Sequence, residues 1–233
     1  MRIIVLSSAV VLLSFLALQA LAEEKGAKAI FYSGEGPTVM AKPPSAPKGK
    51  TESTIPHVEK YMGISYWIEL VDRGGEMKRV ATTRTFRNGE RIKLHIETNR
   101  DGYLYVINIG STGQSRILFP HPGMAGNNFI RAWTHYDVPY NTYMRFDENP
   151  GEELLLVILS PKSLGDIPFT PPLDRPLNTG ETNYYIQTAQ AKGAKDIVLE
   201  TESSGPQLAT YIVAPMSSLE TNMITRQIKL KHN

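Results

Sequence analysis

The sequence predicts a mainly β protein: a single antiparallel β-sandwich or an open barrel, with one short helix and a long proline-rich loop. Two observations carry this prediction. After residue 60, several stretches alternate apolar with polar residues, as half-buried strands do. Gly, Asn, Asp and Pro recur between these stretches as turn residues. We divide the chain into a leader at 1–22, an arm with a proline-rich linker at 23–60, and a β-sandwich domain at 61–233.

Residues 1–22 have the layout of a secretory signal peptide. Arg2 provides a short basic start, residues 3–18 are apolar, and Ala20-Leu21-Ala22 forms a small-x-small cleavage motif. The apolar run is shorter than the roughly 20 residues that a membrane-spanning helix needs. We therefore expect cleavage after Ala22, a mature protein in the periplasm or secreted, and no transmembrane segment once the leader is removed.

The arm divides into two parts. Residues 29–40 begin with apolar residues and contain a Gly-Glu-Gly-Pro turn, so we predict a short docking strand there. Residues 41–58 hold four prolines. Because proline cannot donate to a sheet and breaks helices, we predict a semi-extended linker for this part.

The β-domain begins with alternating strands. Residues 61–71 place apolar side chains on one face, and residues 91–97 place Ile92, Leu94 and Ile96 inward. The same alternation turns His95 outward, so we expect it to face solvent. Two stretches that are apolar on both faces predict central strands; these are 102–109 and 153–160. Further strands are expected at 114–119, 195–200, 208–214 and 223–230.

Two stretches interrupt this pattern. Residues 161–180 contain five prolines, which predicts a long loop. Residues 182–192 predict one short helix, with Thr182 as its N-cap and Gly193 as its stop.

The β-domain contains a series of different short motifs, which follow one another along the chain. They are Phe86-Arg87-Asn88-Gly89-Glu90, Asn99-Arg100-Asp101-Gly102-Tyr103-Leu104-Tyr105-Val106, Leu118-Phe119-Pro120, Asn127-Asn128, Val138-Pro139, Pro150-Gly151-Glu152-Glu153, Lys195-Asp196-Ile197, Thr210-Tyr211 and Ile228-Lys229-Leu230-Lys231-His232. In this order, across about residues 61–232, the chain resembles the bacterial family called domain of unknown function 4384.

The resemblance implies a β-rich module of exported proteins, or one attached to caspase-like peptidase or protein-kinase domains. The activity of that family is not established, so the resemblance supplies no catalytic residue. We expect any enzymatic activity associated with this module to come from a separate partner.

The amino-acid composition excludes several kinds of site and of partner. The chain has no cysteine, which excludes disulfides, thiolate zinc sites and cysteine nucleophiles. Its net charge is +2, from 25 basic and 23 acidic residues, which argues against a nucleic-acid partner. We expect no cofactor, and the sequence leaves the oligomeric state open.

Histidines offer the best candidates for acid–base or metal chemistry. His121 and His135 flank one loop segment, and we hypothesise that they converge with Asp137. Two loop histidines with ordinary roles are the competing interpretation. No pair has the local spacing of metal ligands, so we predict no metal site.

Aromatic residues and arginines gather between 129 and 146. Because Tyr, Trp and Arg commonly anchor interfaces, we take them as candidate binding residues. The candidates are Trp133, Tyr136, Tyr140, Tyr143, Arg131 and Arg145, together with Tyr103 and Tyr105 on a neighbouring strand. The alternative is that the aromatics cap the end of the core.

Three functions follow from these observations. The first is an exported, non-catalytic module that binds an envelope protein or a cell-envelope glycan. The second is an envelope hydrolase that uses His121, His135 and Asp137. The third is an assembly subunit that docks through residues 25–40 by adding a strand to a partner sheet.

Overall fold

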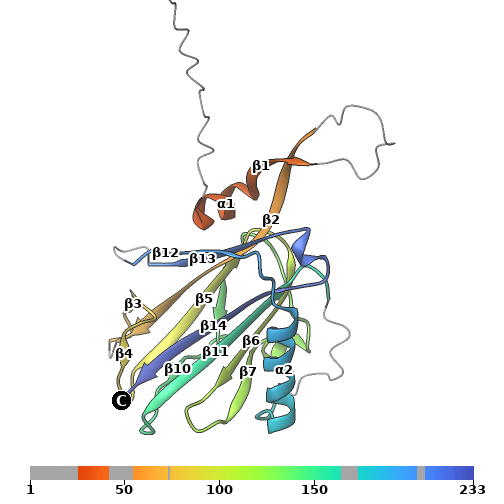
Figure 1. Ribbon diagram of the computed structural model, residues 1–233. Helices are drawn as coiled ribbons and strands as arrows, with labels where there is room; N and C mark the ends of the chain where they lie inside the picture. Colours follow the sequence, from red (N-terminus) through yellow and green to blue (C-terminus); the bar gives the residue numbers. More distant parts are fainter. Residues whose placement is uncertain (1–25, 42–54, 73, 164–172, 204–207) are drawn as a thin grey trace, which may run out of the picture.

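The computed structural model contains two facing β-sheets and two helices (Figure 1). It describes residues 26–41, 55–72, 74–163, 173–203 and 208–233. The predicted leader at 1–22 lies outside the described residues, as do residues 42–54 of the predicted linker and 164–172 of the predicted loop. Within the described part, neither helix is long and apolar enough to cross a membrane.

The first sheet has the strand order β10-β5-β2-β13-β12, and β1, β3 and β9 pair with it outside this path. Its strands are β1 Glu35–Ala41, β2 Ile55–Val71, β3 Met77–Val80, β5 Arg91–Thr98, β9 Tyr136–Val138, β10 Met144–Arg145, β12 Val198–Thr201 and β13 Thr210–Pro215.

The second sheet has the order β4-β14-β11-β6-β7, with β8 paired to β6. Its strands are β4 Thr85–Phe86, β6 Gly102–Ile109, β7 Ser115–Phe119, β8 Phe129–Ile130, β11 Gly151–Ser160 and β14 Ile224–His232. The helices are α1 Ala27–Ser33 and α2 Thr179–Lys192, and two 3₁₀ turns are Pro122–Met124 and Ser218–Glu220.

This architecture confirms the β-sandwich that the alternation predicted, since the two sheets are separate and pack face to face. The strand pairs of both sheets are antiparallel except one: β4 runs parallel to β14.

The main core lies between the sheets and follows the predicted alternation. From β2, Met62, Ile64 and Ile68 point inward, where they meet Leu155 and Leu159 from β11. Each such side chain contributes roughly 1.5–3 kcal/mol by leaving water. The side chains on the outer faces of the two sheets do not contribute to this core.

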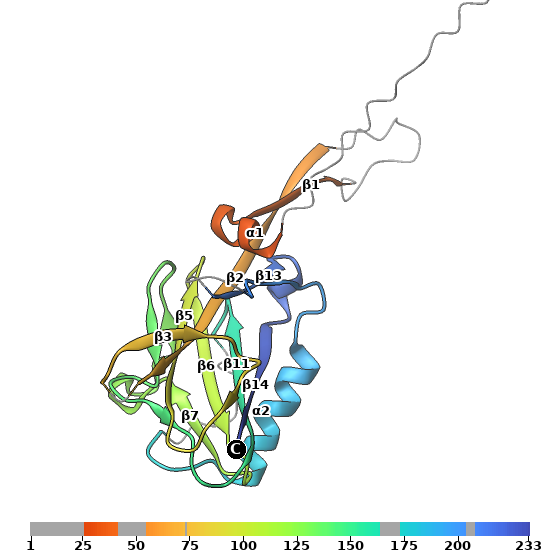
Figure 2. The ribbon, with the colours of Figure 1, turned by 90° about the vertical axis from the view of Figure 1, so that its left-hand side faces the viewer.

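The outer face of the second sheet is covered by α2, which Figure 2 shows on the side away from β3. Tyr185 and Ala189 of the helix are buried in this second apolar cluster. The helix begins at Thr179, three residues before the prediction, and Asn178 caps it. The side chain of Asn178 accepts from the amide of Glu181, whose carboxylate accepts from the amide of Asn178. Gly193 ends the helix as predicted.

The first described part of the arm forms a helix, where the sequence predicted a strand. In α1, Ala27, Ile30 and Phe31 share one face, as residues spaced by three and four do, and pack on β13. Asn99 fixes this contact: its amide nitrogen donates to the carbonyl of Phe31, and its oxygen accepts from the amide of Gly63.

The rest of the described arm pairs within its own chain. β1 lies antiparallel to the first part of β2, which begins at Ile55, inside the segment predicted as linker. Pro56 is tolerated there because β2 has only β1 as its neighbour at that point in the described sheet.

Candidate functional site

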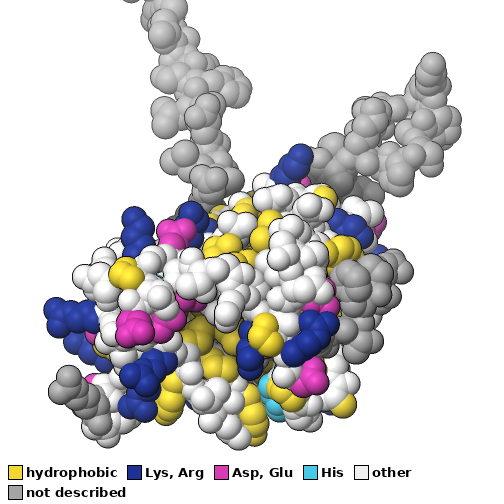
Figure 3. Space-filling view, turned by 90° about the horizontal axis from the view of Figure 1, so that it is seen from below, with side chains coloured by type: hydrophobic (Ala, Val, Ile, Leu, Met, Phe, Trp, Pro, Cys, Tyr) yellow, Lys and Arg dark blue, Asp and Glu magenta, His cyan; other side chains and the backbone are white. Residues whose placement is uncertain are grey.

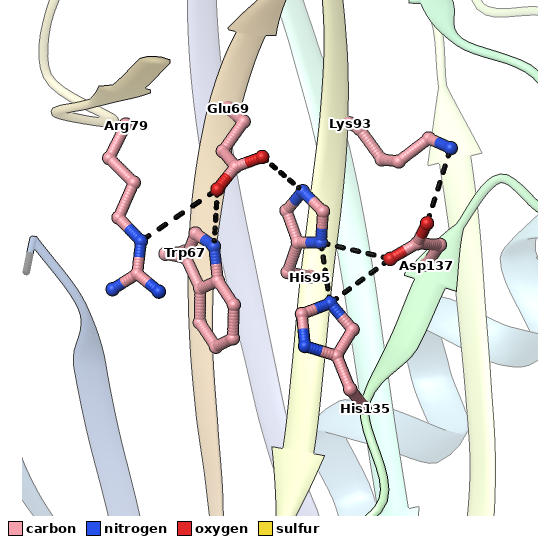
Figure 4. A network of polar contacts seen from close by, with 7 residues as sticks. All are labelled: Trp67, Glu69, Arg79, Lys93, His95, His135 and Asp137. Atoms are coloured by element: carbon pink, nitrogen blue, oxygen red, sulfur yellow. Dashed lines mark hydrogen bonds and ion pairs between the residues drawn. The ribbon is translucent and has the colours of Figure 1, made fainter. Parts of the chain in front are cut away.

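A row of polar side chains crosses the outer face of the first sheet. His95 on β5 lies opposite Trp67 on the neighbouring strand β2 and opposite Asp137 on β9. His135 stands two residues before Asp137, so both side chains emerge on the same face. Figure 4 shows these groups pointing toward one another from three adjacent segments.

His95 is the centre of the row. Its Nδ1 lies 2.7 Å from Nε2 of His135 and 3.0 Å from Oδ1 of Asp137. Its Nε2 lies 3.1 Å from Oε2 of Glu69, a close polar contact without the geometry of a hydrogen bond. Both ring nitrogens of His95 are therefore engaged by polar neighbours.

The expectation that His95 faces solvent is wrong. It points away from the main core, as predicted, but it is only 3% exposed. The indole of Trp67 stacks on its ring at 5.2 Å and 10°, and the ring of His135 meets it edge-on at 4.9 Å. This burial lowers the pKa of His95 below its ordinary value, although Glu69 and Asp137 act in the opposite direction. The neutral imidazole is the favoured form at neutral pH.

Glu69 is itself held in place. Its Oε1 accepts a hydrogen bond from the indole nitrogen of Trp67 at 3.2 Å and lies 3.8 Å from Nε of Arg79. The Arg79 guanidinium in turn lies 4.0 Å from the centre of the Trp67 ring. The carboxylate that faces His95 is thus fixed by an indole and a guanidinium.

Asp137 connects three partners. Oδ1 lies 3.0 Å from a ring nitrogen of each histidine, and Oδ2 accepts from Nζ of Lys93 at 3.3 Å. Partial burial raises the pKa of Asp137, but His95 and Lys93 outweigh this and lower it overall. Lys93 also lies 4.9 Å from the centre of the Tyr143 ring, which belongs to a separate cleft.

The predicted trio does not form. His135 and Asp137 meet as hypothesised, but His121 lies elsewhere, with its ring stacked on Tyr140 at 4.3 Å and 12°. Among the contacts of the described residues, none joins His121 to His135 or Asp137. The buried His95 takes the place that the sequence assigned to His121.

The cleft that holds His121 opens at the end of the sandwich opposite α1, between the two sheets. It has a volume of about 480 Å³. Seen from that end, hydrophobic side chains gather in the middle, with basic and acidic side chains around them (Figure 3). Its lining includes Asn108, Arg116, His121, Tyr140, Tyr143 and Arg145. Three of the predicted binding residues, Tyr140, Tyr143 and Arg145, therefore share one cavity.

The other predicted binding residues are dispersed. Trp133 is 51% exposed near the opposite end, where it stacks on Tyr32 of α1 at 6.2 Å. Tyr136 is half-buried, and its hydroxyl accepts from the amide of Arg131, whose side chain is exposed. Tyr103 is half-buried against Phe129.

Tyr105 is not on a binding surface. It is buried beneath α2, beside Tyr185. Of the aromatics between 129 and 146, Phe146 is buried and Tyr140 is exposed, so the segment supplies both core and surface.

The sequence interpretation missed His95, Glu69 and Lys93. The available clue was the alternation itself, because His95 and Lys93 share a face of β5, and His135, just before β9, lies two residues from Asp137 in β9. What was lacking was the pairing of β5 with β9, which joins residues about forty positions apart.

The family comparison supports the resemblance over the middle of the chain, which holds the motifs from Phe86 to Glu153. The model of the family described as domain of unknown function (DUF4384) matches residues 85–163. That range runs from β4 past the end of β11, and contains His95, His135, Asp137 and most of the cleft lining. The comparisons with curated proteins and with solved structures found no match.

Proposed function

We propose that this protein is an exported, non-catalytic binding module that holds a neutral glycan of the cell envelope in the cleft between the two sheets. The cleft carries the proposal, because it presents exposed aromatic faces beside planar hydrogen-bonding groups. Its volume of about 480 Å³ lies in the range of small-molecule sites, roughly 300–1,000 Å³.

Tyr140 offers the first contact for a sugar ring. One face of its ring is occupied by His121, and the side chain is still 53% exposed. Tyr143 is also exposed in the same cavity. The C–H faces of a pyranose are apolar and pack on such rings, whose faces carry partial negative charge.

The polar lining matches hydroxyl groups. Arg116 and Arg145 bring guanidinium donors, while Asp147 and Glu153 bring carboxylate acceptors. Glu153 is oriented by Asn108, whose amide donates to it at 2.7 Å. Because both signs of charge line the cavity, it favours a neutral polyol over a polyanion.

The other two functions receive less support. A hydrolase built from His121, His135 and Asp137 would need them in one unit, and His121 belongs to the cleft while the other two contact His95. Docking through residues 25–40 would need a free strand, and the described part of that arm packs on β13 and pairs with β2.

Co-sedimentation with purified envelope polysaccharide tests the binding function. We expect the protein to sediment with the polymer, and the double variant Tyr140→Ala/Tyr143→Ala to stay in solution. Tyr32→Ala is the matched control, since Tyr32 is an exposed tyrosine on α1, outside the cleft. Binding that survives the double substitution, or capture of a protein and no polysaccharide, would contradict the proposal.

Export is tested separately. Fractionation of cells that produce the full chain should place the protein in the periplasm or the medium, with Glu23 as the first residue of the mature form. Retention in the cytoplasm with an intact leader would rule out this part of the proposal.

A further inference from the structure

We propose that His95, His135 and Asp137 bind a divalent transition-metal ion such as Zn²⁺. The site lies on the outer face of the first sheet and is separate from the glycan cleft. The sequence spacing did not predict it, because one ligand comes from β5 and two from the segment that ends in β9.

The three ligand atoms form a nearly regular triangle. The distance from Nδ1 of His95 to Nε2 of His135 is 2.7 Å, and each of these nitrogens lies 3.0 Å from Oδ1 of Asp137. Ligands about 2.0–2.1 Å from one ion, at mutual angles of 90–109°, are separated by roughly 2.9–3.4 Å. A single ion can therefore reach all three atoms with only small shifts of the side chains.

The surroundings orient His95 as a ligand. The carboxylate of Glu69 lies 3.1 Å from Nε2, on the side of the ring away from the cluster. When Nδ1 binds an ion, the ring proton must sit on Nε2, and the negative charge of Glu69 stabilises it there. Stacking on Trp67 fixes the plane of the ring. A carboxylate behind a ligating histidine is the usual outer partner of such ligands in metal sites.

The cluster is open on one side. The side chain of His95 is 4% exposed, whereas those of His135 and Asp137 are 46% and 40% exposed. Three protein ligands with solvent access leave a coordination position for water or for a group of another molecule. This is the pattern of an exchangeable site, since closed structural zinc sites use four protein ligands.

The ligand chemistry selects the class of ion. Two imidazoles and one carboxylate suit Zn²⁺, Fe²⁺, Co²⁺, Ni²⁺ or Cu²⁺, while Mg²⁺ and Ca²⁺ prefer oxygen ligands. Lys93 opposes binding, because its ammonium group holds the other oxygen of Asp137. Neutralising Lys93 should therefore tighten the site.

Titration of the full protein, purified without a polyhistidine tag and freed of metal by chelation, tests the proposal. We expect calorimetry with Zn²⁺ to show one ion bound per chain. Co²⁺ should give visible absorption bands that vanish when Zn²⁺ displaces it. The absence of saturable binding of both ions would overturn the proposal and identify the cluster as a structural hydrogen-bonded group.

Variants locate the ion. His135→Gln and Asp137→Asn alter partly exposed ligands, and we expect each to weaken Zn²⁺ affinity at least about 100-fold. Glu69→Gln changes the outer carboxylate and should cost about 10–100-fold. His121→Gln is the matched control, since it removes a cleft histidine and should leave affinity unchanged. Equal losses in the control and the ligand variants would refute the site.

The fluorescence of Trp67 reports where the metal ion binds, independently of how tightly it binds. The chain has two tryptophans, so Trp133→Phe leaves Trp67 as the sole indole. Cu²⁺ bound beside the ring of His95, which lies 5.2 Å from Trp67, should quench its fluorescence strongly. Stoichiometric binding without quenching would place the ion elsewhere and overturn the assignment.

Lys93→Gln should change the Zn²⁺ affinity in the opposite direction from the ligand substitutions. We expect tighter Zn²⁺ binding, by about tenfold, because one positive charge close to the ion is removed. A weaker site in this variant would contradict the arrangement proposed for Asp137.

Discussion

The outer faces of the two sheets are used in different ways. On the second sheet the outward side chains of β6 and β11 beneath α2 are apolar, and the helix buries them in a cluster that includes Tyr105, Ile158 and Tyr185. On the first sheet the outward positions around β5 are polar, and they form the row of Trp67, His95 and Asp137. α1 covers only the end of that sheet formed by β13 and its neighbours.

The difference follows from the alternation of side chains along a strand, which places the residues that stabilise the core on one face and leaves the other face available for polar chemistry. In both sheets one set of side chains fills the core, which leaves the other set free to change. Covering that second set with a helix adds buried apolar area. Where the outer face is polar and only partly covered, as around β5, burial and close polar side chains together shift pKa values, as for His95 and Asp137.

The largest effect is expected beneath α2. Ile158→Ala removes a fully buried side chain from the covered face and should lower the free energy of unfolding by about 2–5 kcal/mol. Urea denaturation measures this. Leu199→Ala, at a side chain that is 41% exposed on the edge strand β12, should change stability by less than about 0.5 kcal/mol. Similar losses in both variants would break the comparison.

The next effect concerns the attachment of the covering helix. Asn178→Ala deletes the N-cap of α2 and should cost about 1 kcal/mol in the free energy of unfolding. Asn178→Asp keeps an acceptor for the amide of Glu181 and should be nearly neutral. If thermal unfolding shows no difference between the two variants, the cap does not stabilise the covered face.

A smaller effect is expected on the polar outer face, where burial of His95 should make the free energy of unfolding depend on pH. The pKa of His95 is lowered in the folded state, so the unfolded state binds more protons between that pKa and 6.5. The stabilisation is complete above pH 6.5 and is lost as the pH falls below it. Urea denaturation at several pH values, in the presence of a chelator, measures this loss.

The His95 contribution can be isolated by substitution. His95→Gln should flatten the fall in stability below pH 6.5, whereas His121→Gln should retain it. A fall of the same size in His95→Gln and the parent protein would assign the pH dependence to other groups.

The smallest effect on stability is expected at Asp137. Its side chain is 40% exposed, so Asp137→Asn should change the free energy of unfolding by at most about 1 kcal/mol. The same substitution should remove metal binding. A large destabilisation would mean that the polar row supports the fold, and the contrast between the two outer faces would fail.

Much of the fold was predictable because it depends on local patterns. The alternation in residues 61–71 and 91–97 predicted which side chains of β2 and β5 form the core, and the structure confirms them. The helix at 27–33 was missed because its apolar face spans only two turns, beside a Gly-Pro segment typical of strands and turns. The sequence does not predict Asn178 as the N-cap, because this residue lies in a proline-rich stretch that is typical of a loop.

The candidate sites were predictable only in part. The segment 129–146 was identified, and three of its residues share the cleft. The histidine cluster depends on the register of β5 with β9, and on Trp67 covering a side chain that alternation alone places in water. Pairing between distant strands is fixed by the whole sheet, so no short motif contains it.

Lys93 stands between the two proposed sites. Its ammonium group contacts Asp137 and also lies over the ring of Tyr143 in the cleft. An ion bound at Oδ1 of Asp137 would repel the ammonium group of Lys93, which also lies over the aromatic ring where a sugar would pack. The two ligands are then thermodynamically linked, and linkage is reciprocal: by whatever factor the metal changes the affinity for glycan, the glycan changes the affinity for metal.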